Sequence, residues 1–176
     1  MEQLIAEWGY IVLALYSFGG GMVALIAAGI LSYSGDLNII ISIIVAVVAN
    51  FIGDQFLFTL ARNNRTQAKQ MMQKYRRKIA LSHLLMRKYG SIVIFLQKYI
   101  YGVKTLIPLA MGITKYDYKK FLFCNILASI VWGIIVGLGA YYLGNILYDY
   151  IKEFKSIAIG FIVILLIGIG YLFNKK

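Results

Sequence analysis

The sequence predicts an all-α polytopic membrane protein: two opposed re-entrant hairpins with spanning helices in an inverted-repeat-like order, plus a basic amphipathic surface helix. Three observations predict this class. Of the 176 residues, 61% are hydrophobic and 14% are charged, whereas about a quarter of a soluble domain is charged. Several apolar runs approach or exceed the roughly 20 residues that cross a bilayer. The net charge is +11, and clustered Lys and Arg in such a chain indicate topology and contact with anionic headgroups.

The first apolar block, residues 9–35, is interrupted by the sequence SFGGGM at positions 17–22. Three successive glycines, beginning with Gly19, are poor helix formers. Irregular backbone at membrane depth is tolerated only where protein or a water-filled cavity covers it. We therefore expect residues 9–35 to form a re-entrant hairpin.

Residues 37–61 form the first predicted spanning helix, because in lipid only a helix satisfies the hydrogen bonds of a β-branched apolar run. The following segment, 62–90, is strongly basic and contains no Asp or Glu. Its apolar residues recur at roughly helical spacing, which predicts a basic amphipathic helix on the membrane surface. A solvated connector is the alternative.

The second apolar block, residues 91–113, contains the sequence QKYIYGVKTLIPLAMG. The positive-inside rule places the basic clusters before and after this block in the cytoplasm. Both of its ends then lie on one side of the membrane, which predicts a second re-entrant hairpin that enters from the opposite face. Spanning helices at 121–148 and 156–173, joined by an outside connection, complete a single membrane domain of residues 1–176.

Asp54 is a candidate functional residue, because a carboxylate in the hydrocarbon region is costly unless it is paired or neutral. Asn50 lies four residues earlier and Arg62 eight residues later, so all three share one helix face. Asp54 is expected to act as a proton carrier or as the counter-ion of a buried lysine. The alternative is a hydrated carboxylate near a membrane edge that Arg62 marks.

Lys98 and Lys104 are the other candidates for transport or substrate binding. Lys98 is close enough to the start of its hairpin for its ammonium to snorkel to the headgroups. Lys104 lies beside the hairpin tip and needs a partner, which is Asp54, a helix carbonyl end or an anionic ligand. A phosphate suits such a site because broken helices also present free backbone amides.

Four further residues are expected to have structural roles. Gly102 and Pro108, the only proline in the chain, break the second hairpin. Asn125 and Trp132 lie on the helix that follows, and we expect them to join and pack helices.

Other chemistry is sparse in this sequence. There is no His/Cys cluster for a metal, no paired carboxylates and no GxxxxGK[ST] phosphate loop. We expect no cofactor, no metal and no enzymatic activity. The expected partner is an anionic or phosphate-bearing membrane lipid rather than nucleic acid. Small residues at Gly133, Gly137 and Gly139 allow close helix contact, either within one chain or in a homo-oligomer.

The segment from Gln97 to Gly144 resembles the signature half of the DedA family, also called SNARE-associated or VTT-domain proteins. The stretch GDQFLFTLAR, from Gly53 to Arg62, is similar to a motif in the first half of that family. The positions that fit the signature half are Lys98, Tyr99, Gly102, Lys104, Thr105, Pro108, Gly112, Phe121, Asn125, Trp132, Tyr141 and Gly144.

The resemblance implies two opposed re-entrant hairpins and a function in lipid movement. Bacterial family members are linked to translocation of undecaprenyl phosphate across the inner membrane and to membrane homeostasis, and eukaryotic relatives scramble phospholipids. The family's functional positions carry over to Asp54, Lys98 and Lys104. We therefore expect a lipid translocase or scramblase in the bacterial cytoplasmic membrane. A small proton- or ion-coupled transporter, or a scaffold with a basic surface helix, are the alternatives.

The sequence also departs from the family pattern. Both family arginines are lysines here, which keeps the charge but loses the bidentate fork of a guanidinium. Tyr101 replaces a proline, and Met22 stands where the first hairpin of the family carries a glutamate. The loss of that acid weakens the case for proton coupling and favours passive lipid scrambling.

Overall fold

A computed structural model describes residues 2–67, 70, 84–86, 88–100, 104–114 and 116–173. These residues are helical with short connections and contain no strand, so the all-α prediction is confirmed. Most of the predicted surface helix at 62–90, and the Tyr101-Gly102 tip of the second hairpin, lie outside the described residues. The elements in chain order are α1 (Glu2–Gly19), α2 (Met22–Tyr33), α3 (Ile39–Asn63), η1 (Gly90–Ile92), α6 (Val93–Leu96), η2 (Gln97–Tyr99), α7 (Leu106–Ile113) and α8 (Tyr118–Phe173).

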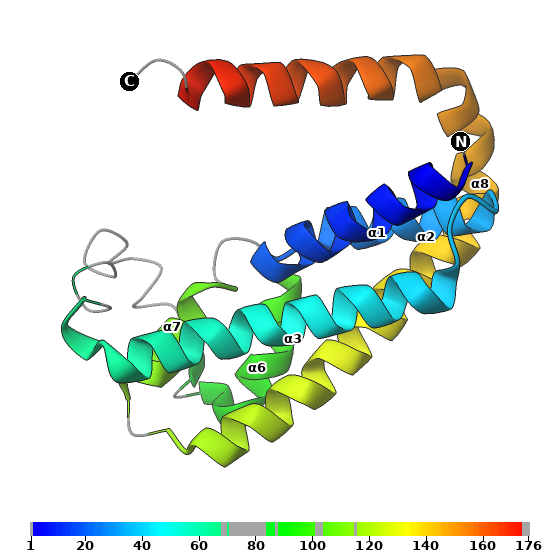
Figure 1. Cartoon of the computed structure of the whole chain (residues 1–176). Coiled ribbons are helices and arrows are strands. Elements are labelled where there is room, and N and C mark those ends of the chain that lie inside the picture. The colour runs from blue at the N-terminus through cyan, green and yellow to red at the C-terminus, as the bar shows by residue number, and fades with distance from the viewer. Residues whose placement is uncertain are drawn as a thin grey trace.

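Helices α1 and α2 double back on each other at the glycine run (Figure 1). Gly19 is the last residue of α1, and Gly20 has a φ of +129°, a conformation that only glycine adopts readily. A Cβ on Gly21 would overlap the backbone of Tyr16 and Ser17. The three glycines therefore produce the reversal that the sequence predicted near this point.

Helix α3 begins at Ile39 because Asn38 caps it. The Asn38 Oδ1 accepts hydrogen bonds from the backbone N–H groups of Ile40, at 2.9 Å, and Ile41, at 3.2 Å. Within the described residues, two helices are long and apolar enough to cross a membrane: Ile39–Asn63, with a mean hydropathy of 2.1, and Tyr118–Gly144 in α8, with 2.3.

The second half of the chain begins with the short elements η1, α6 and η2, which lead to α7. Pro108 is the third residue of α7. Proline is tolerated in the first turn because the N–H that it lacks has no partner within the helix. Pro108 therefore lies in the first turn of α7 and does not break the helix.

Helix α8 is continuous from Tyr118 to Phe173, whereas the sequence analysis expected two helices, 121–148 and 156–173, with a connection between them. The residues between these two expected helices, 149–155, contain no glycine or proline. Their Lys and Glu residues are also good helix formers, so charge alone does not end the helix. Figure 1 shows α8 bending over so that its last part runs across the top of the bundle.

Helices α3 and α8 pack closely at small residues. A Cβ on Gly133 would overlap Val47, and one on Gly137 would overlap Ile43. These two glycines therefore serve a contact within the chain, while a Cβ on Gly139 would meet no atom within 4 Å. Gly53 meets the backbone of Phe18 in the same way, which fixes the end of α1 against α3.

Candidate functional site

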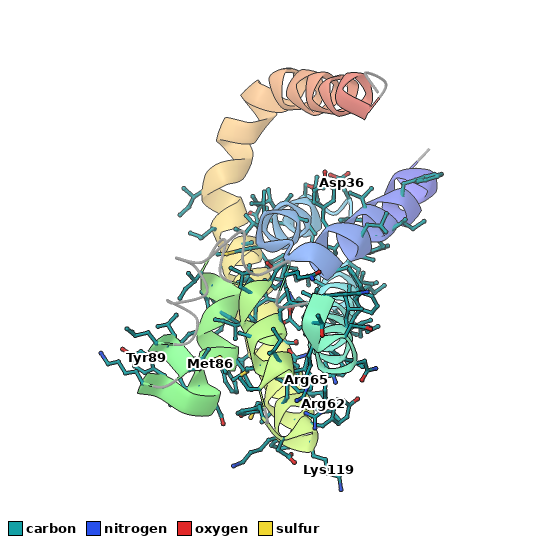
Figure 2. The ribbon with its side chains drawn as sticks, turned by 90° about the vertical axis from the view of Figure 1, so that its left-hand side faces the viewer. Asp36, Arg62, Arg65, Met86, Tyr89 and Lys119 are labelled. Atoms are coloured by element: carbon teal, nitrogen blue, oxygen red, sulfur yellow. The ribbon has the colours of Figure 1, made fainter. Side chains whose placement is uncertain are left out.

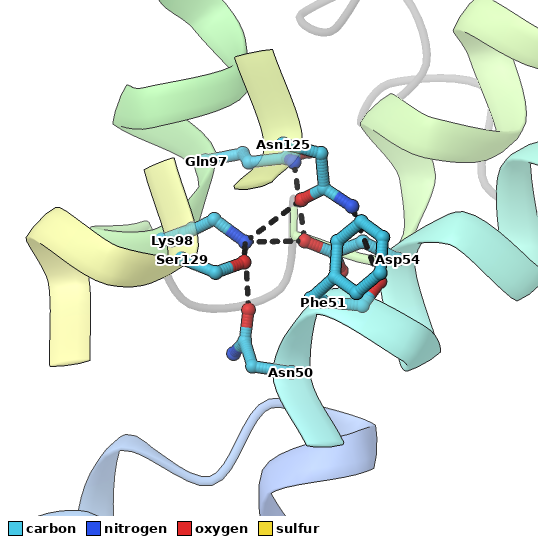
Figure 3. A network of polar contacts seen from close by, with 7 residues as sticks. All are labelled: Asn50, Phe51, Asp54, Gln97, Lys98, Asn125 and Ser129. Carbon is cyan, nitrogen blue, oxygen red and sulfur yellow. Dashed lines mark hydrogen bonds and ion pairs between the residues drawn. The ribbon is translucent and has the colours of Figure 1, made fainter. Parts of the chain in front are cut away.

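A buried lysine joins three parts of the fold. Lys98 lies in η2, is 3% exposed, and directs its ammonium between α3 and α8 (Figure 3). Its Nζ is 2.7 Å from Asp54 Oδ2, 2.6 Å from Asn50 Oδ1, 2.9 Å from Ser129 Oγ and 3.1 Å from Asn125 Oδ1.

Helical spacing brings the four acceptors together. Asn50 and Asp54 are four residues apart on α3, and Asn125 and Ser129 are four residues apart on α8, so each pair shares one face of its helix. The Asn125 Nδ2 also donates to the Phe51 carbonyl at 3.1 Å, which links α8 to α3.

The Lys98–Asp54 pair is electrically balanced and its ammonium is saturated. An ammonium has three N–H donors, and four acceptors already surround the Lys98 Nζ. No donor is left for a ligand. Asp54 was expected to be the counter-ion of a buried lysine and was named as one partner for Lys104. The structure pairs it with Lys98 instead.

Lys104 is also buried, being 8% exposed, but among the described residues its Nζ has no hydrogen-bond partner. The Nζ lies 5.6 Å from the centre of the Trp132 ring, within the range of a cation–π contact. Gly20 leaves room beside it, because a Cβ there would lie 3.4 Å from the Lys104 Cδ. Lys104 therefore carries a charge that no carboxylate balances directly.

Both lysines line a cavity of about 600 Å³ between the α1–α2 reversal and the segment around Lys104. None of the described residues that line it is Asp or Glu, and Met22, which stands where the first hairpin of the DedA family carries a glutamate, is part of its wall. The cavity is thus cationic. Its lining residues are Leu15, Tyr16, Gly19, Gly20, Gly21, Met22, Val23, Ala24, Lys98, Tyr99, Ile100, Lys104 and Thr105.

The first turn of α2 adds free donors to this cavity. The Met22 N–H donates to the Gly20 carbonyl, and the Leu25 N–H donates to the Gly21 carbonyl. Val23 and Ala24, which both line the cavity, lie in the first turn of α2, where the N–H groups of a helix have no partner within the helix. The beginning of a helix is positively polarised by these groups.

In the described part of the chain, six further buried side-chain atoms lack a partner. They are the donors Asn50 Nδ2, Gln55 Nε2 and Trp132 Nε1, the acceptors Gln55 Oε1 and Gln97 Oε1, and the Ser17 hydroxyl, which can do either. None of them belongs to a residue that lines the cavity, whose walls carry the Lys104 ammonium and the first turn of α2. Such an arrangement suits a ligand that brings several oxygen acceptors.

Arg62 does not join this site. Its Nη1 donates to the Tyr116 carbonyl at 2.7 Å, and its guanidinium lies 5.7 Å from the centre of the Phe58 ring. Figure 2 shows Arg62 near Arg65 and Lys119 at one end of the bundle, with Asp36 at the other. Arg62 thus connects the end of α3 to the start of α8.

The structural residues of the sequence analysis are spread through the fold. Gly19 lines the cavity, Asn125 binds Lys98, and Trp132 lies under Lys104. A Cβ on Gly112 would overlap the Phe58 carbonyl, so this glycine brings α7 against α3. Pro108 is buried in α7.

Sequence reasoning missed two members of the polar network. Ser129 is four residues after Asn125, a spacing that could have been read as one helix face. Gln97 precedes Lys98, and its Nε2 lies 3.5 Å from Asp54 Oδ2. In the described part of the chain, no group of three His, Cys, Asp or Glu residues is placed to hold a metal ion.

Comparison with known proteins adds independent information. The VTT domain model matches residues 18–142 of this chain. The chain is 20% identical over 181 residues to the inner membrane protein YohD of Escherichia coli (strain K12), an alignment that covers 100% of this chain and 94% of YohD. It is 22% identical over 183 residues to protein DedA of the same organism, with 93% of this chain and 83% of DedA covered.

A third relative is named as a transporter of undecaprenyl phosphate. The chain is 27% identical over 123 residues to undecaprenyl phosphate transporter A of Bacillus subtilis (strain 168), and the alignment covers 68% of this chain and 58% of that protein. No solved structure shows significant similarity to the chain.

Proposed function

Because this chain belongs to the VTT domain (DedA) family of membrane proteins, we propose that it moves a phosphate-bearing lipid between the leaflets of the bacterial cytoplasmic membrane. The lipid is undecaprenyl phosphate or a phospholipid, and its phosphate binds at Lys104. One observation carries the proposal: Lys104 presents a buried ammonium to a cavity, and the described residues provide it with neither a hydrogen-bond acceptor nor a carboxylate on the cavity wall. The name of the Bacillus subtilis relative supports the same class of substrate.

The electrostatics of the cavity favour an anion. A cation that is removed from water is costly unless an opposite charge or acceptors compensate it. A phosphate would supply both to Lys104, and its remaining oxygens could accept hydrogen bonds from the free N–H groups of Val23 and Ala24. Lysine would hold the phosphate as a point charge, without the fixed fork of arginine.

The two lysines have different tasks in this proposal. Lys98 is held by Asp54 and three further acceptors, so it joins α3, η2 and α8 behind the cavity. Lys104 is free to bind and release the headgroup. A phosphate that binds at Lys104 does not have to displace a carboxylate from it.

Helix lengths support a re-entrant arrangement of both hairpins. A helix rises about 1.5 Å per residue, so α2, with 12 residues, is about 18 Å long, and α7, with 8 residues, is about 12 Å long. Both are shorter than the hydrocarbon core of about 30 Å. We propose that the two hairpins enter from opposite faces and that the end with Arg62, Arg65 and Lys119 faces the cytoplasm.

Passive movement is favoured over proton coupling. Met22, which stands in place of the glutamate of the family's first hairpin, lines the cavity, and Asp54 is held by Lys98. An ion-coupled transporter would require Asp54 to leave this pair in each cycle. Passive scrambling therefore predicts that the rate of lipid movement changes little when a pH gradient is applied.

The proposal is tested by lipid movement in proteoliposomes. Fluorescent polyprenyl phosphate and fluorescent phosphatidylcholine are followed between leaflets, at two pH values, for wild type, Lys104→Gln and Lys104→Arg. A hydrogen bond to a charged group contributes about 1.5–3 kcal/mol. Lys104→Gln should therefore slow movement of the lipid that the wild type transports about tenfold to a hundredfold. Lys104→Arg should retain most of it.

Lys119→Gln is the matched control, because Lys119 is exposed at the start of α8 and far along the helix from Trp132. It should move the lipid at the wild-type rate. Wild-type activity in Lys104→Gln, or movement of neither lipid by folded wild-type protein, would refute the proposal.

A further inference from the structure

A second hollow lies on the outer face of the bundle between α1 and α3. Its volume is about 490 Å³, and every residue that lines it is apolar. Five of these residues are exposed, among them Leu15 at 71%, Ile44 at 56% and Val48 at 49%. The lining residues are Ala14, Leu15, Phe18, Ile44, Val45, Val48, Ala49 and Ile52; we call this hollow the α1–α3 groove.

Packing of the two helices shapes the α1–α3 groove. Ala14 on α1 and Ala49 on α3 are small, so the helices leave a hollow there. Near Gly53 the end of α1 comes into close contact with α3, and Phe18 packs on Phe56 with ring centres 6.1 Å apart. The stretch from Ile44 to Ile52 gives the groove a length of about 12 Å along α3.

The groove adjoins the cationic cavity. Leu15 lines both of them, so the apolar hollow and the space that contains Lys104 share one side chain of their walls. A cationic cavity beside an apolar groove has the two parts that an anionic amphiphile needs. The charge of its headgroup matches Lys104, and its hydrocarbon chain matches the groove.

We propose that the α1–α3 groove binds a hydrocarbon chain of the lipid whose phosphate lies at Lys104. This inference rests on the proposed function. The chain passes over Leu15, so it stays at the lipid-facing side of α1 while the headgroup occupies the cavity. The groove thereby selects a phosphate attached to a long apolar chain over a soluble phosphate.

Photolabelling tests this binding site. Full-length protein in nanodiscs of digalactosyldiacylglycerol, which has no phosphate, is mixed with a trace of phosphatidate that carries a diazirine in the middle of one acyl chain, and labelled residues are mapped by mass spectrometry. We expect labelling of 44–52, loss of that labelling in Lys104→Gln, and competition by unlabelled phosphatidate. Labelling of the exposed α8 residues around Ile135, which is 58% exposed, should not change.

A groove labelled equally in wild type and Lys104→Gln would overturn the inference, because the probe would then mark lipid that surrounds the protein without headgroup recognition. So would the absence of labelling at 44–52 under conditions that label the region of Ile135. If Lys104→Gln still slows lipid movement in either case, the proposed function stands and only the groove is refuted.

Filling the groove gives a second measurement. Val48→Trp places a large side chain in the groove at a half-exposed position, so the fold should tolerate it. Ile135→Trp makes the same kind of change on α8, away from both hollows. Movement of the long-chain phosphate lipid should fall several-fold in Val48→Trp relative to Ile135→Trp. Equal rates in the two variants would contradict the inference.

Discussion

Replacing Lys98 with methionine should destabilise the protein strongly, because Asp54 would remain buried without its counter-ion. The Lys98 side chain is 0% exposed and that of Asp54 is 2% exposed. Removing one partner of a buried ion pair costs about 3–5 kcal/mol. Asn50 and Ser129 would lose their donor as well, and each unsatisfied buried acceptor adds about 1–3 kcal/mol. These costs overlap, so we expect a loss of at least about 3 kcal/mol.

The assay is the free energy of unfolding in mixed detergent micelles. Wild type is compared with Lys98→Met, Asp54→Leu and the double variant. Because apolar replacement of a whole buried pair is often neutral or stabilising, the double variant should recover much of the loss. Lys119→Met, at an exposed position, should stay within about 0.5 kcal/mol of wild type. A Lys98→Met loss as small as that of the control would refute the account of this network.

Two further predictions concern packing and capping. Gly53→Ala should cost about 1–3 kcal/mol, because its Cβ would overlap the Phe18 carbonyl; unfolding measurements that show no loss would contradict the close contact of α1 with α3. Asn38→Ala should cost about 0.5–2 kcal/mol through loss of the α3 cap, and Asn38→Ser should retain most of the stability. Equal stabilities of the two Asn38 variants would argue against capping.

Length and glycine content made the helices predictable. The apolar run that became α3 is long enough to cross a bilayer, and the three glycines at 19–21 do mark the reversal between α1 and α2. The continuation of α8 through 149–155 was not predictable from charge. Polar residues there are compatible with a connection or with an exposed helix, and only Gly or Pro would have distinguished them.

Pairing of the charged residues could be predicted only in part. Asp54 and a lysine were expected to meet, but whether Lys98 or Lys104 does so depends on how η2 turns into the bundle. Arg62 shares a helix face with Asp54, yet eight residues of helix separate them by about 12 Å along the axis. Periodicity therefore predicted the direction of Arg62 and not its distance from the site.

Whether Lys104 has a partner depends on the three-dimensional fold and could not be predicted from the sequence. The sequence shows no acid near Lys104, but a distant carboxylate could still have reached it. Only the packing of the α1–α2 reversal against Trp132 reveals a cavity with an ammonium and free amides on its walls.

Protection of Lys104 from reductive methylation tests the central claim most directly. The protein is treated with formaldehyde and a borohydride in nanodiscs of digalactosyldiacylglycerol, a lipid without a phosphate, with or without phosphatidate, and each lysine is quantified by mass spectrometry. The account predicts that phosphatidate protects Lys104, that the exposed Lys119 reacts in both membranes, and that the saturated Lys98 reacts in neither. Equal modification of Lys104 in the two membranes, or none in either, would contradict the claim that its ammonium binds a lipid phosphate in an accessible cavity.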